Sequence, residues 1–404
     1  MLSLEKRFLD YISYDTQSDS SAVGIRRPTT EGQERLLKHL GDELEALGLD
    51  VYYGRENVVI GKLKGTCSGK CIAFMAHVDT SDETEGNGVK PIVHRAYDGG
   101  SIALPYLTIT PEDEPDLLLY KGSTIITSDG STLLGADDKA GCAIIIEALS
   151  RLVSAHDSLY PDIEVFFTPD EETGSGMDRF PIERMKAEVC YTIDGGREGE
   201  IEAGCFNAAS VVVRVQGTPY HPGYGRGKLV NALSVMSRII SLLPQAESPE
   251  ATDGSYGYYY PSSIRGSAAE AEAEILVRDF SFDSLKNRID FISGTADAIA
   301  AMYHAKSTVE SSITYRNMRD TLAEKPEALC RILKAGEKLG MPLYVTDIRG
   351  GTDGAWLSER GIPSPNIFTG GHAFHSNSEW IALDAMERSV DLVLGIIREA
   401  ICER

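Results

Sequence analysis

The chain has 404 residues, 42% of them hydrophobic, so it is long enough to bury a sizeable core and to form two domains. Its 61 acidic and 39 basic residues give a net charge of −22, which repels nucleic acid and anionic membrane surfaces. We therefore expect no nucleic-acid partner and, because no apolar run approaches the length of a membrane span, no membrane partner. The N-terminus lacks the apolar core of a secretory signal and the seven cysteines are scattered, which is typical of a cytoplasmic protein.

The first half of the chain alternates predicted helices and strands, as in an α/β fold. An N-terminal helix and a long helix over residues 31–47 precede several apolar, strand-like runs, and residues 139–152 form a proline-free helical pattern. Between residues 86 and 126, turn dipeptides and short β-type runs predict hairpins, which we interpret as decoration. We expect a mixed, mostly parallel sheet flanked by helices.

The pattern changes near residue 207. It predicts six further elements: strand 208–216, helix 229–243, strand 256–264, strand 270–279, helix 283–303 and strand 307–315. The order β-α-β-β-α-β is that of a ferredoxin-like α+β domain. Helix and strand then resume, and residues 380–401 predict a closing amphipathic helix. The sequence therefore indicates one α/β domain in two parts, residues 1–206 and 317–404, interrupted by an inserted domain, residues 207–316.

Five apolar, strand-like runs end in residues that can bind a metal ion or transfer a proton. The runs are residues 71–76, 132–136, 163–167, 190–193 and 366–368, and the polar residues that follow them are His77 with Asp79, Asp137, Asp170 with Glu171 and Glu172, Asp194, and His372 with His375. In a mostly parallel sheet the carboxyl ends of the strands share one edge, where ligands collect. We therefore expect imidazoles and carboxylates to converge there.

Most of these residues also have an ordinary structural explanation. His77 could be a hydrogen-bonded core histidine, Asp137 a helix cap, and Asp194 the start of an Asp-Gly turn. Glu171 and Glu172 are harder to explain, because adjacent carboxylates repel each other unless a cation or a proton resolves the conflict. The recurrence at five strand ends favours one shared site over five coincidences.

The residue types in this group indicate which chemistry the site would support. Histidine and carboxylate ligands without thiolate suit zinc, manganese or cobalt, and a carboxylate that bridges two ions suits a two-metal hydrolase. Counting charges supports two ions, because Asp137, Glu172, Asp194 and one bridging hydroxide would balance four positive charges. The sequence contains no Gly-x-Ser-x-Gly elbow, phosphate-binding loop or dinucleotide-binding glycine motif, so serine and nucleotide chemistry lack support.

Short motifs surround these residues and continue through the rest of the chain. They are His77-Val-Asp79, Gly135-Ala-Asp-Asp-Lys-Ala-Gly141, Thr168-Pro-Asp-Glu-Glu172, Tyr191-Thr-Ile-Asp-Gly-Gly196, Phe206-Asn-Ala-Ala-Ser210, His221-Pro-Gly223, Val230-Asn-Ala-Leu-Ser234, Ile348-Arg-Gly-Gly-Thr-Asp-Gly354 and Phe368-Thr-Gly-Gly371. Through them nearly the whole chain resembles the tripeptide aminopeptidases of the M20 family of zinc metallopeptidases. The resemblance implies that the α/β domain is catalytic and that the inserted domain is a lid.

The resemblance implies a metal site with two Zn²⁺ per subunit, for which Mn²⁺ or Co²⁺ are substitutes. Asp137 would bridge the two ions. His77 and Asp194 would bind one ion, and Glu172 and His375 would bind the other.

Two further expectations concern the surroundings of these ligands. His372 is a competing candidate ligand, and we prefer His375 because it follows an aromatic residue, Phe374, as in the family. The resemblance also implies a cis peptide bond between Asp137 and Asp138, held in that form for ligand placement.

The resemblance also assigns catalytic roles. Glu171 would be the general base that activates a metal-bridged hydroxide and then returns the proton to the leaving amine. Asp79 would orient His77 through the second ring nitrogen. His221, in the lid, would stabilise the oxyanion of the tetrahedral intermediate.

The expected substrate is a short peptide, a tripeptide that loses its N-terminal residue. Arg278 and Arg349 would bind its terminal carboxylate, because a guanidinium pairs with a carboxylate through two parallel bonds. The alternatives are another M20-type amidohydrolase, namely a dipeptidase, carboxypeptidase or deacylase, and a non-catalytic metal-containing peptide-binding protein. The resemblance also allows a homodimer formed through the lid.

Overall fold

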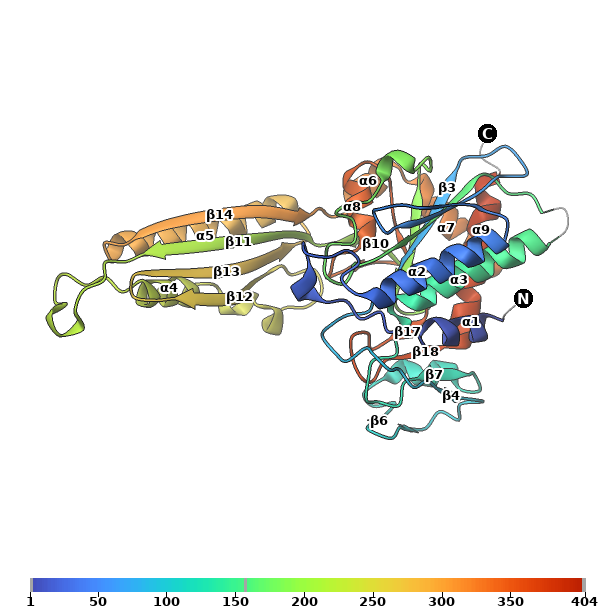
Figure 1. Ribbon diagram of the computed structural model, residues 1–404, viewed down its shortest axis with the longest axis horizontal. Coiled ribbons are helices and arrows are strands. Elements are labelled where there is room, and N and C mark those ends of the chain that lie inside the picture. The colour runs from blue at the N-terminus through green and yellow to red at the C-terminus, as the bar shows by residue number, and fades with distance from the viewer. Residues whose placement is uncertain (1–2, 156–157, 402–404) are drawn as a thin grey trace. The chain divides into compact units, whose positions relative to one another are not determined.

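The computed structural model of the protein describes residues 3–155 and 158–401 (Figure 1). The chain forms two compact units. Unit 1 consists of Met1–Ala203, Asp320–Thr346 and Thr352–Arg404, and unit 2 of Gly204–Arg319 and Asp347–Gly351. The segment predicted as the inserted domain, residues 207–316, therefore lies within unit 2. Within the described ranges, no helix combines the length and the apolar character that a bilayer crossing requires.

Unit 1 is built on an eight-stranded sheet whose central strands are parallel. In spatial order the strands are β1 (Asp50–Tyr53), β2 (Val59–Leu63), β8 (Ile163–Thr168), β3 (Ile72–His77), β9 (Cys190–Gly195), β16 (Asn366–Phe368), β10 (Glu200–Cys205) and β15 (Tyr344–Ile348). Strands β8, β3, β9 and β16 run parallel to one another, whereas β1, β2 and β10 pair in antiparallel fashion. The predicted mixed, mostly parallel sheet is confirmed.

Helices flank this sheet. They are α1 (Leu4–Tyr11), α2 (Glu31–Ala46), α3 (Ala136–Ser154), α6 (Arg319–Glu324), α7 (Glu327–Leu339), α8 (Asp353–Glu359) and α9 (Leu383–Ile401). Helix α3 packs on β3 and β9 and also contacts α1 and α9, which is why nearly all of its side chains are buried. Its sequence, rich in Ala and Ile and free of Pro, suits a helix enclosed on most sides. The central position of α3 brings its first residues to the carboxyl edge of the sheet.

The segment between residues 86 and 126 is more than the decoration that we predicted. Its strands β4 (Ile92–His94) and β7 (Ile125–Thr127) join β17 (Gly371–His372) and β18 (Trp380–Ala382) in a second sheet of unit 1, in the order β17-β18-β7-β4. Strands β5 (Ile102–Ala103) and β6 (Thr108–Ile109) form a separate hairpin. The closing helix begins at Leu383, because residues 380–382 form a strand that pairs with β7. Strands β4 and β7 therefore extend the sheet formed by β17 and β18, next to the segment that contains His372 and His375.

Unit 2 has the predicted β-α-β-β-α-β order, in the elements β11 (Asn207–Gln216), α4 (Ala232–Ser241), β12 (Tyr258–Gly266), β13 (Glu270–Asp279), α5 (Phe282–Met302) and β14 (Lys306–Tyr315). Its antiparallel sheet has the order β12-β13-β11-β14, that of a ferredoxin-like domain. Alternate residues of β11 and β13, such as Val213 and Ala273, pack in one core with α4 and α5. Asn231 and Ser281 cap the two helices through side-chain oxygens that accept backbone N–H groups. The ferredoxin-like prediction is confirmed.

Candidate metal centre

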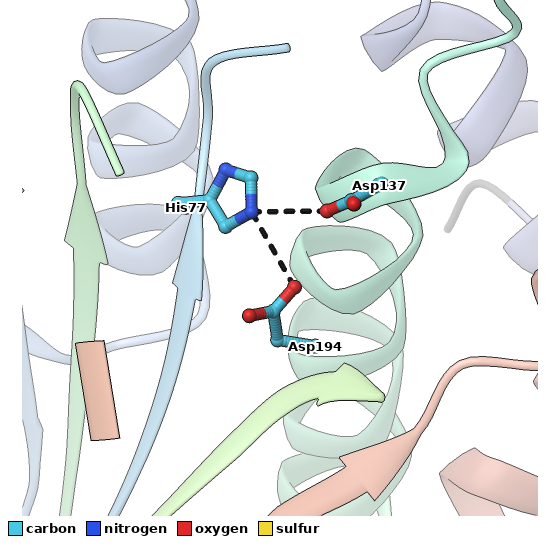
Figure 2. A group of neighbouring side chains, drawn as sticks. All are labelled: His77, Asp137 and Asp194. Atoms are coloured by element: carbon cyan, nitrogen blue, oxygen red, sulfur yellow. Dashed lines mark hydrogen bonds and ion pairs between the residues drawn. The ribbon is translucent and has the colours of Figure 1, made fainter. Parts of the chain in front are cut away.

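Two groups of potential metal ligands lie side by side in unit 1 and share Asp137. In the first, His77 Nε2 lies 3.0 Å from Asp137 Oδ1 and 3.4 Å from Asp194 Oδ1 (Figure 2). In the second, His375 Nε2 lies 3.3 Å from Asp137 Oδ2 and 3.0 Å from Glu172 Oε1. Each oxygen of Asp137 thus faces a different histidine. This is the arrangement that a carboxylate bridging two cations requires.

Different elements deliver these side chains to one edge of the sheet. His77 ends β3 and Asp194 lies near the end of the parallel strand β9 (Figure 2). Glu172 follows β8. The predicted convergence at the carboxyl ends of parallel strands holds for these three residues. His375 follows β17, and its backbone has a left-handed φ of 59°.

Asp137 reaches the site in a way that the sequence analysis did not predict. The run over residues 132–136, which we expected to be a strand, belongs to none, and Asp137 lies in the first turn of α3. Its φ and ψ angles, −83° and 107°, are not helical. The predicted cis peptide bond between Asp137 and Asp138 is present. Asp138 turns away from both groups, where its carboxylate accepts the backbone N–H groups of His77 and Gly141, each at 3.1 Å.

The electrostatics of the two groups call for positive charge. Burial raises the pKa of Asp194 to about 6, and burial together with the Asp137 carboxylate raises the pKa of Glu172 to about 7. The Asp137 and Glu172 carboxylates raise the pKa of His375 to about 11. Burial disfavours a charged His77, yet Asp194 and the other carboxylates around it raise its pKa well above the ordinary value. Carboxylates packed this closely are stabilised by a cation between them.

The donor set fits divalent metal ions. It contains only imidazole nitrogens and carboxylate oxygens, which suit zinc, manganese and cobalt. Glu172 Oε1 is buried, and among the described residues no well-aligned hydrogen bond reaches it, although His375 Nε2 is 3.0 Å away. A buried carboxylate oxygen without a hydrogen-bond donor can be satisfied by a cation instead. The residues present therefore fit a dinuclear site.

Asp79 connects the first group to the loop that follows β8. His77 Nδ1 lies 3.1 Å from the main-chain carbonyl oxygen of Asp79 and 3.3 Å from its carboxylate Oδ1, so a proton on Nδ1 leaves Nε2 free to face Asp137 and Asp194. The same carboxylate accepts the backbone N–H of Glu171 at 3.0 Å and that of Glu172 at 3.1 Å. The sequence analysis predicted the contact with His77 and missed the two backbone contacts.

Glu171 precedes the ligand Glu172 on this loop. Burial raises the pKa of Glu171 well above its ordinary value, and the negative charges of Asp194 and Asp353 add to the rise, while His77 opposes it. A raised pKa makes a carboxylate a stronger proton acceptor. The environment of Glu171 thus suits acid–base chemistry.

An N-terminal segment that the sequence analysis did not single out holds this loop from the other side. Asp170 Oδ1 accepts hydrogen bonds from the backbone N–H of Thr29 at 2.8 Å, from its hydroxyl at 2.6 Å and from the Gln33 amide at 2.9 Å. Arg27 donates to the carbonyl oxygens of Ser175 at 2.6 Å and Gly176 at 2.7 Å. The two sides fix the backbone that carries Glu171 and Glu172. No local sequence pattern signals these long-range contacts.

His372 belongs to neither ligand group. Its ring stacks on Trp380, with ring centroids 4.0 Å apart and planes 2° apart, and Nδ1 lies 3.5 Å from Asp116 Oδ2. Burial lowers its pKa to about 4. His372, the competing candidate ligand of the sequence analysis, thus packs against Trp380 and is in neither ligand group.

The remaining predicted site residues belong to unit 2. His221 is exposed in the loop after β11, where Nδ1 accepts the N–H of Gly223 at 3.2 Å. Arg278, on β13, donates to the carbonyl oxygen of Val277 at 3.0 Å, and its guanidinium lies 5.5 Å from the centroid of the Tyr315 ring.

Arg349 is tied to a loop of unit 2. It donates to the carbonyl oxygens of Gly254 and Tyr256 and to the Thr252 hydroxyl, each at 2.9 Å, and its guanidinium lies over the ring of Phe206.

Comparison with known proteins agrees with this geometry. The model of peptidase family M20/M25/M40 matches residues 127–399. The chain belongs to this family. The resemblance to M20 metallopeptidases that the motifs indicated is therefore confirmed.

The family includes relatives that match over almost their whole length. Peptidase T from Clostridium perfringens (strain 13) is 39% identical over 403 residues, covering 98% of this chain and 99% of the relative. Peptidase T from Edwardsiella ictaluri is 42% identical over 404 residues, covering 98% of this chain and 97% of the relative.

Solved structures share the fold. The crystal structure of aminopeptidase PepT from Bacillus cereus has a TM-score of 0.78 at 22% identity, with 98% of each chain covered. A dinuclear metal-binding M20 peptidase from Bacillus subtilis has a TM-score of 0.65 at 15% identity, covering 98% of this chain and 96% of that one.

Proposed function

We propose that the protein is a tripeptide aminopeptidase, which releases the N-terminal residue of a short peptide. The observation that carries the proposal is the shared Asp137, whose two oxygens face His77 and His375 in adjacent ligand groups. The relatives that match nearly the whole chain are named peptidase T, and one protein of the same fold, from Staphylococcus aureus, is a tripeptidase.

We propose that two divalent ions occupy this centre, with zinc as the native metal and Mn²⁺ or Co²⁺ as substitutes. His77 and Asp194 would hold one ion, Glu172 and His375 the other, and Asp137 both. When bound, such ions polarise a peptide carbonyl and lower the pKa of water towards neutrality.

Glu171 would be the general base. Its carboxylate would accept a proton from the attacking water and deliver it to the amine that leaves. Asp79 would keep Glu171 in register with the ligands, because it binds the backbone N–H of Glu171 and also faces His77. The base and the first ligand group therefore share one support.

The residues of unit 2 would act on the substrate. Arg278 and Arg349 would bind the terminal carboxylate, because a guanidinium pairs with a carboxylate through two parallel bonds. His221 would stabilise the oxyanion. Residues 207–316 would act as a lid.

Two wider proposals follow from unit 2 and from the cysteines. A homodimer would form through unit 2, because β12 and β14 are the outer strands of its sheet and leave backbone groups open to pairing. The cytoplasm would be the compartment, since the six cysteines of the described ranges are all free. Sedimentation at increasing protein concentration would test the dimer.

The function is tested by following release of the N-terminal amino acid from a tripeptide by zinc-loaded wild type, Glu171→Gln and the exposed control Glu183→Gln. Metal content is measured on the same samples. We expect turnover by wild type and by Glu183→Gln, and loss of turnover in Glu171→Gln with about two ions retained. Cleavage of an N-blocked tripeptide would instead point to a carboxypeptidase or deacylase. Metal binding without turnover of any peptide would favour a peptide-binding protein.

A further inference from the structure

A buried carboxylate outside both ligand groups holds the backbone of Asp137. Glu379 is 1% exposed. Its Oε2 accepts the backbone N–H of Leu134 at 2.6 Å and of Gly135 at 2.8 Å. Its Oε1 accepts the backbone N–H of Ala136 at 2.7 Å and of Asp137 at 3.1 Å. One side chain thus binds four consecutive peptide groups.

These contacts use the hydrogen-bonding capacity of an ionised carboxylate. Its two oxygens offer about four acceptor sites, and here four backbone donors fill them. All four partners are donors. A protonated carboxyl or an amide at this position would therefore point one of its own hydrogens at a backbone N–H group. The loop curls around Glu379 because Gly135 has a left-handed φ of 81°, a conformation that favours glycine.

The last peptide group in the series belongs to the residue that both ligand groups share. Helix α3 does not fix Asp137, because the φ and ψ angles of Asp137 and Asp138 are not helical. Asp137 N is also one of the first-turn N–H groups that have no acceptor within the helix, and Glu379 supplies that acceptor. Glu379 also lies four residues after His375, so one short segment supplies a ligand to one group and an anchor to both.

We propose that Glu379 is a positioning residue that sets the backbone of Asp137 and, through it, the geometry of both metal sites. The inference rests on the proposed dinuclear centre. This positioning role differs from that of a metal ligand, since the oxygens of Glu379 accept hydrogen bonds from peptide groups. It also differs from general stabilisation of the fold, since it predicts that the affinities for both ions fall together.

The experiment compares wild type with Glu379→Gln, Glu379→Asp and a matched control, Glu164→Gln. Glu164 is 2% exposed, lies on β8 of the same unit and accepts the backbone N–H of Lys186 at 2.7 Å and of Ala187 at 3.0 Å. Zn²⁺ affinity is measured for each of the two ions by competition with a chromophoric chelator. Thermal unfolding of the metal-free proteins reports the loss of stability in each variant.

We expect Glu379→Gln to bind both ions about 10–100-fold more weakly than wild type, the range seen when the support of a metal ligand is removed. Glu379→Asp keeps the charge but is shorter by one methylene, so its affinity for both ions should lie between those of wild type and Glu379→Gln. Glu164→Gln should unfold at a lower temperature and bind both ions as wild type does. Should Glu379→Gln fail to fold, Glu379→Asp decides on the same criterion.

Three outcomes would overturn the inference. Wild-type affinity for both ions in Glu379→Gln would show that Asp137 needs no such anchor. An equal loss of affinity in Glu164→Gln would show that any buried-carboxylate defect weakens the ions. If the wild-type protein does not bind two Zn²⁺ ions, the proposed centre and the inference are both overturned. The titration of wild type alone identifies this outcome.

Discussion

Replacing Asp79 by asparagine removes one support from two parts of the site at once. The carboxylate is fully buried and accepts the backbone N–H groups of Glu171 and Glu172 through different oxygens. It also lies 3.3 Å from His77 Nδ1. Asparagine has one oxygen and one amide nitrogen in the same space. Whichever way the amide turns, one of the two backbone N–H groups faces an NH₂ group and loses its acceptor.

The expected size of the effect follows from these contacts. A buried donor without a partner costs about 1–3 kcal/mol, so the free energy of unfolding of the metal-free Asp79→Asn protein should fall by about that amount. Loss of the charged partner of a metal-binding histidine lowers metal affinity or activity by about 10–100-fold. We therefore expect kcat/KM for an unblocked tripeptide to fall by about 10–100-fold, with the larger part in kcat because Glu171 shifts with its backbone.

The assay combines urea unfolding of the metal-free protein with steady-state kinetics at saturating Zn²⁺. Asp162→Asn is the control, because its carboxylate accepts the backbone N–H of Gly65 at 2.8 Å outside the site. The control should keep wild-type kinetics. If Asp79→Asn kept kcat/KM within about threefold of wild type, Asp79 would not orient the base and the first ligand group, and the reasoning would be refuted.

Two further predictions concern His372 and the arginines of unit 2. Burial lowers the pKa of His372 to about 4, against about 6.5 when unfolded, and its charged neighbours are Asp116 and Arg197. Its neutral form stabilises the native state above pH 6.5, and this stability is lost as the pH falls towards 4. Between pH 7 and pH 4, the free energy of unfolding of wild type in urea should fall by up to about 3 kcal/mol relative to that of His372→Phe. The His372→Phe protein should still bind two ions at pH 7. A difference in unfolding free energy that stays constant with pH would contradict this prediction. Arg278→Gln and Arg349→Gln should each raise KM for a free tripeptide about 10–100-fold and leave KM for the C-amidated peptide unchanged, since a charge-assisted hydrogen bond contributes about 1.5–3 kcal/mol. Equal effects on both peptides would contradict a carboxylate clamp.

The sequence predicted those features that depend on periodic side-chain patterns. The parallel order of β3, β8 and β9 brings His77, Glu172 and Asp194 to one edge, as expected from apolar runs that end in polar residues. The alternating pattern of unit 2 gave the correct element order because one face of each strand is buried by helices.

Features that depend on distant backbone contacts were not predicted. The run over residues 132–136 was predicted as a strand, yet the backbone N–H groups of Leu134, Gly135 and Ala136 donate to Glu379, more than two hundred residues away. Trp380 reads as the start of a helix, but pairing with Thr127 makes it part of a strand. In both cases backbone groups of the segment pair with a distant part of the chain, which leaves no trace in the local pattern of side chains.

The same distinction separates the carboxylates that face the metal centre from those that support it. Asp79, Asp170 and Glu379 accept backbone N–H groups, and these donors balance their charge, so they do not compete for a cation. Asp137, Asp194 and Glu172 direct oxygens at imidazole nitrogens instead.

Each supporting carboxylate also acts on a ligand-bearing segment. Asp79 and Asp170 hold the loop with Glu171 and Glu172 from two sides, and Glu379 holds Asp137. A chain with 61 acidic residues therefore selects its ligands by geometry. Asp137, Asp194 and Glu172 face imidazole nitrogens at the shared site, and they are the carboxylates that the metal ions would take.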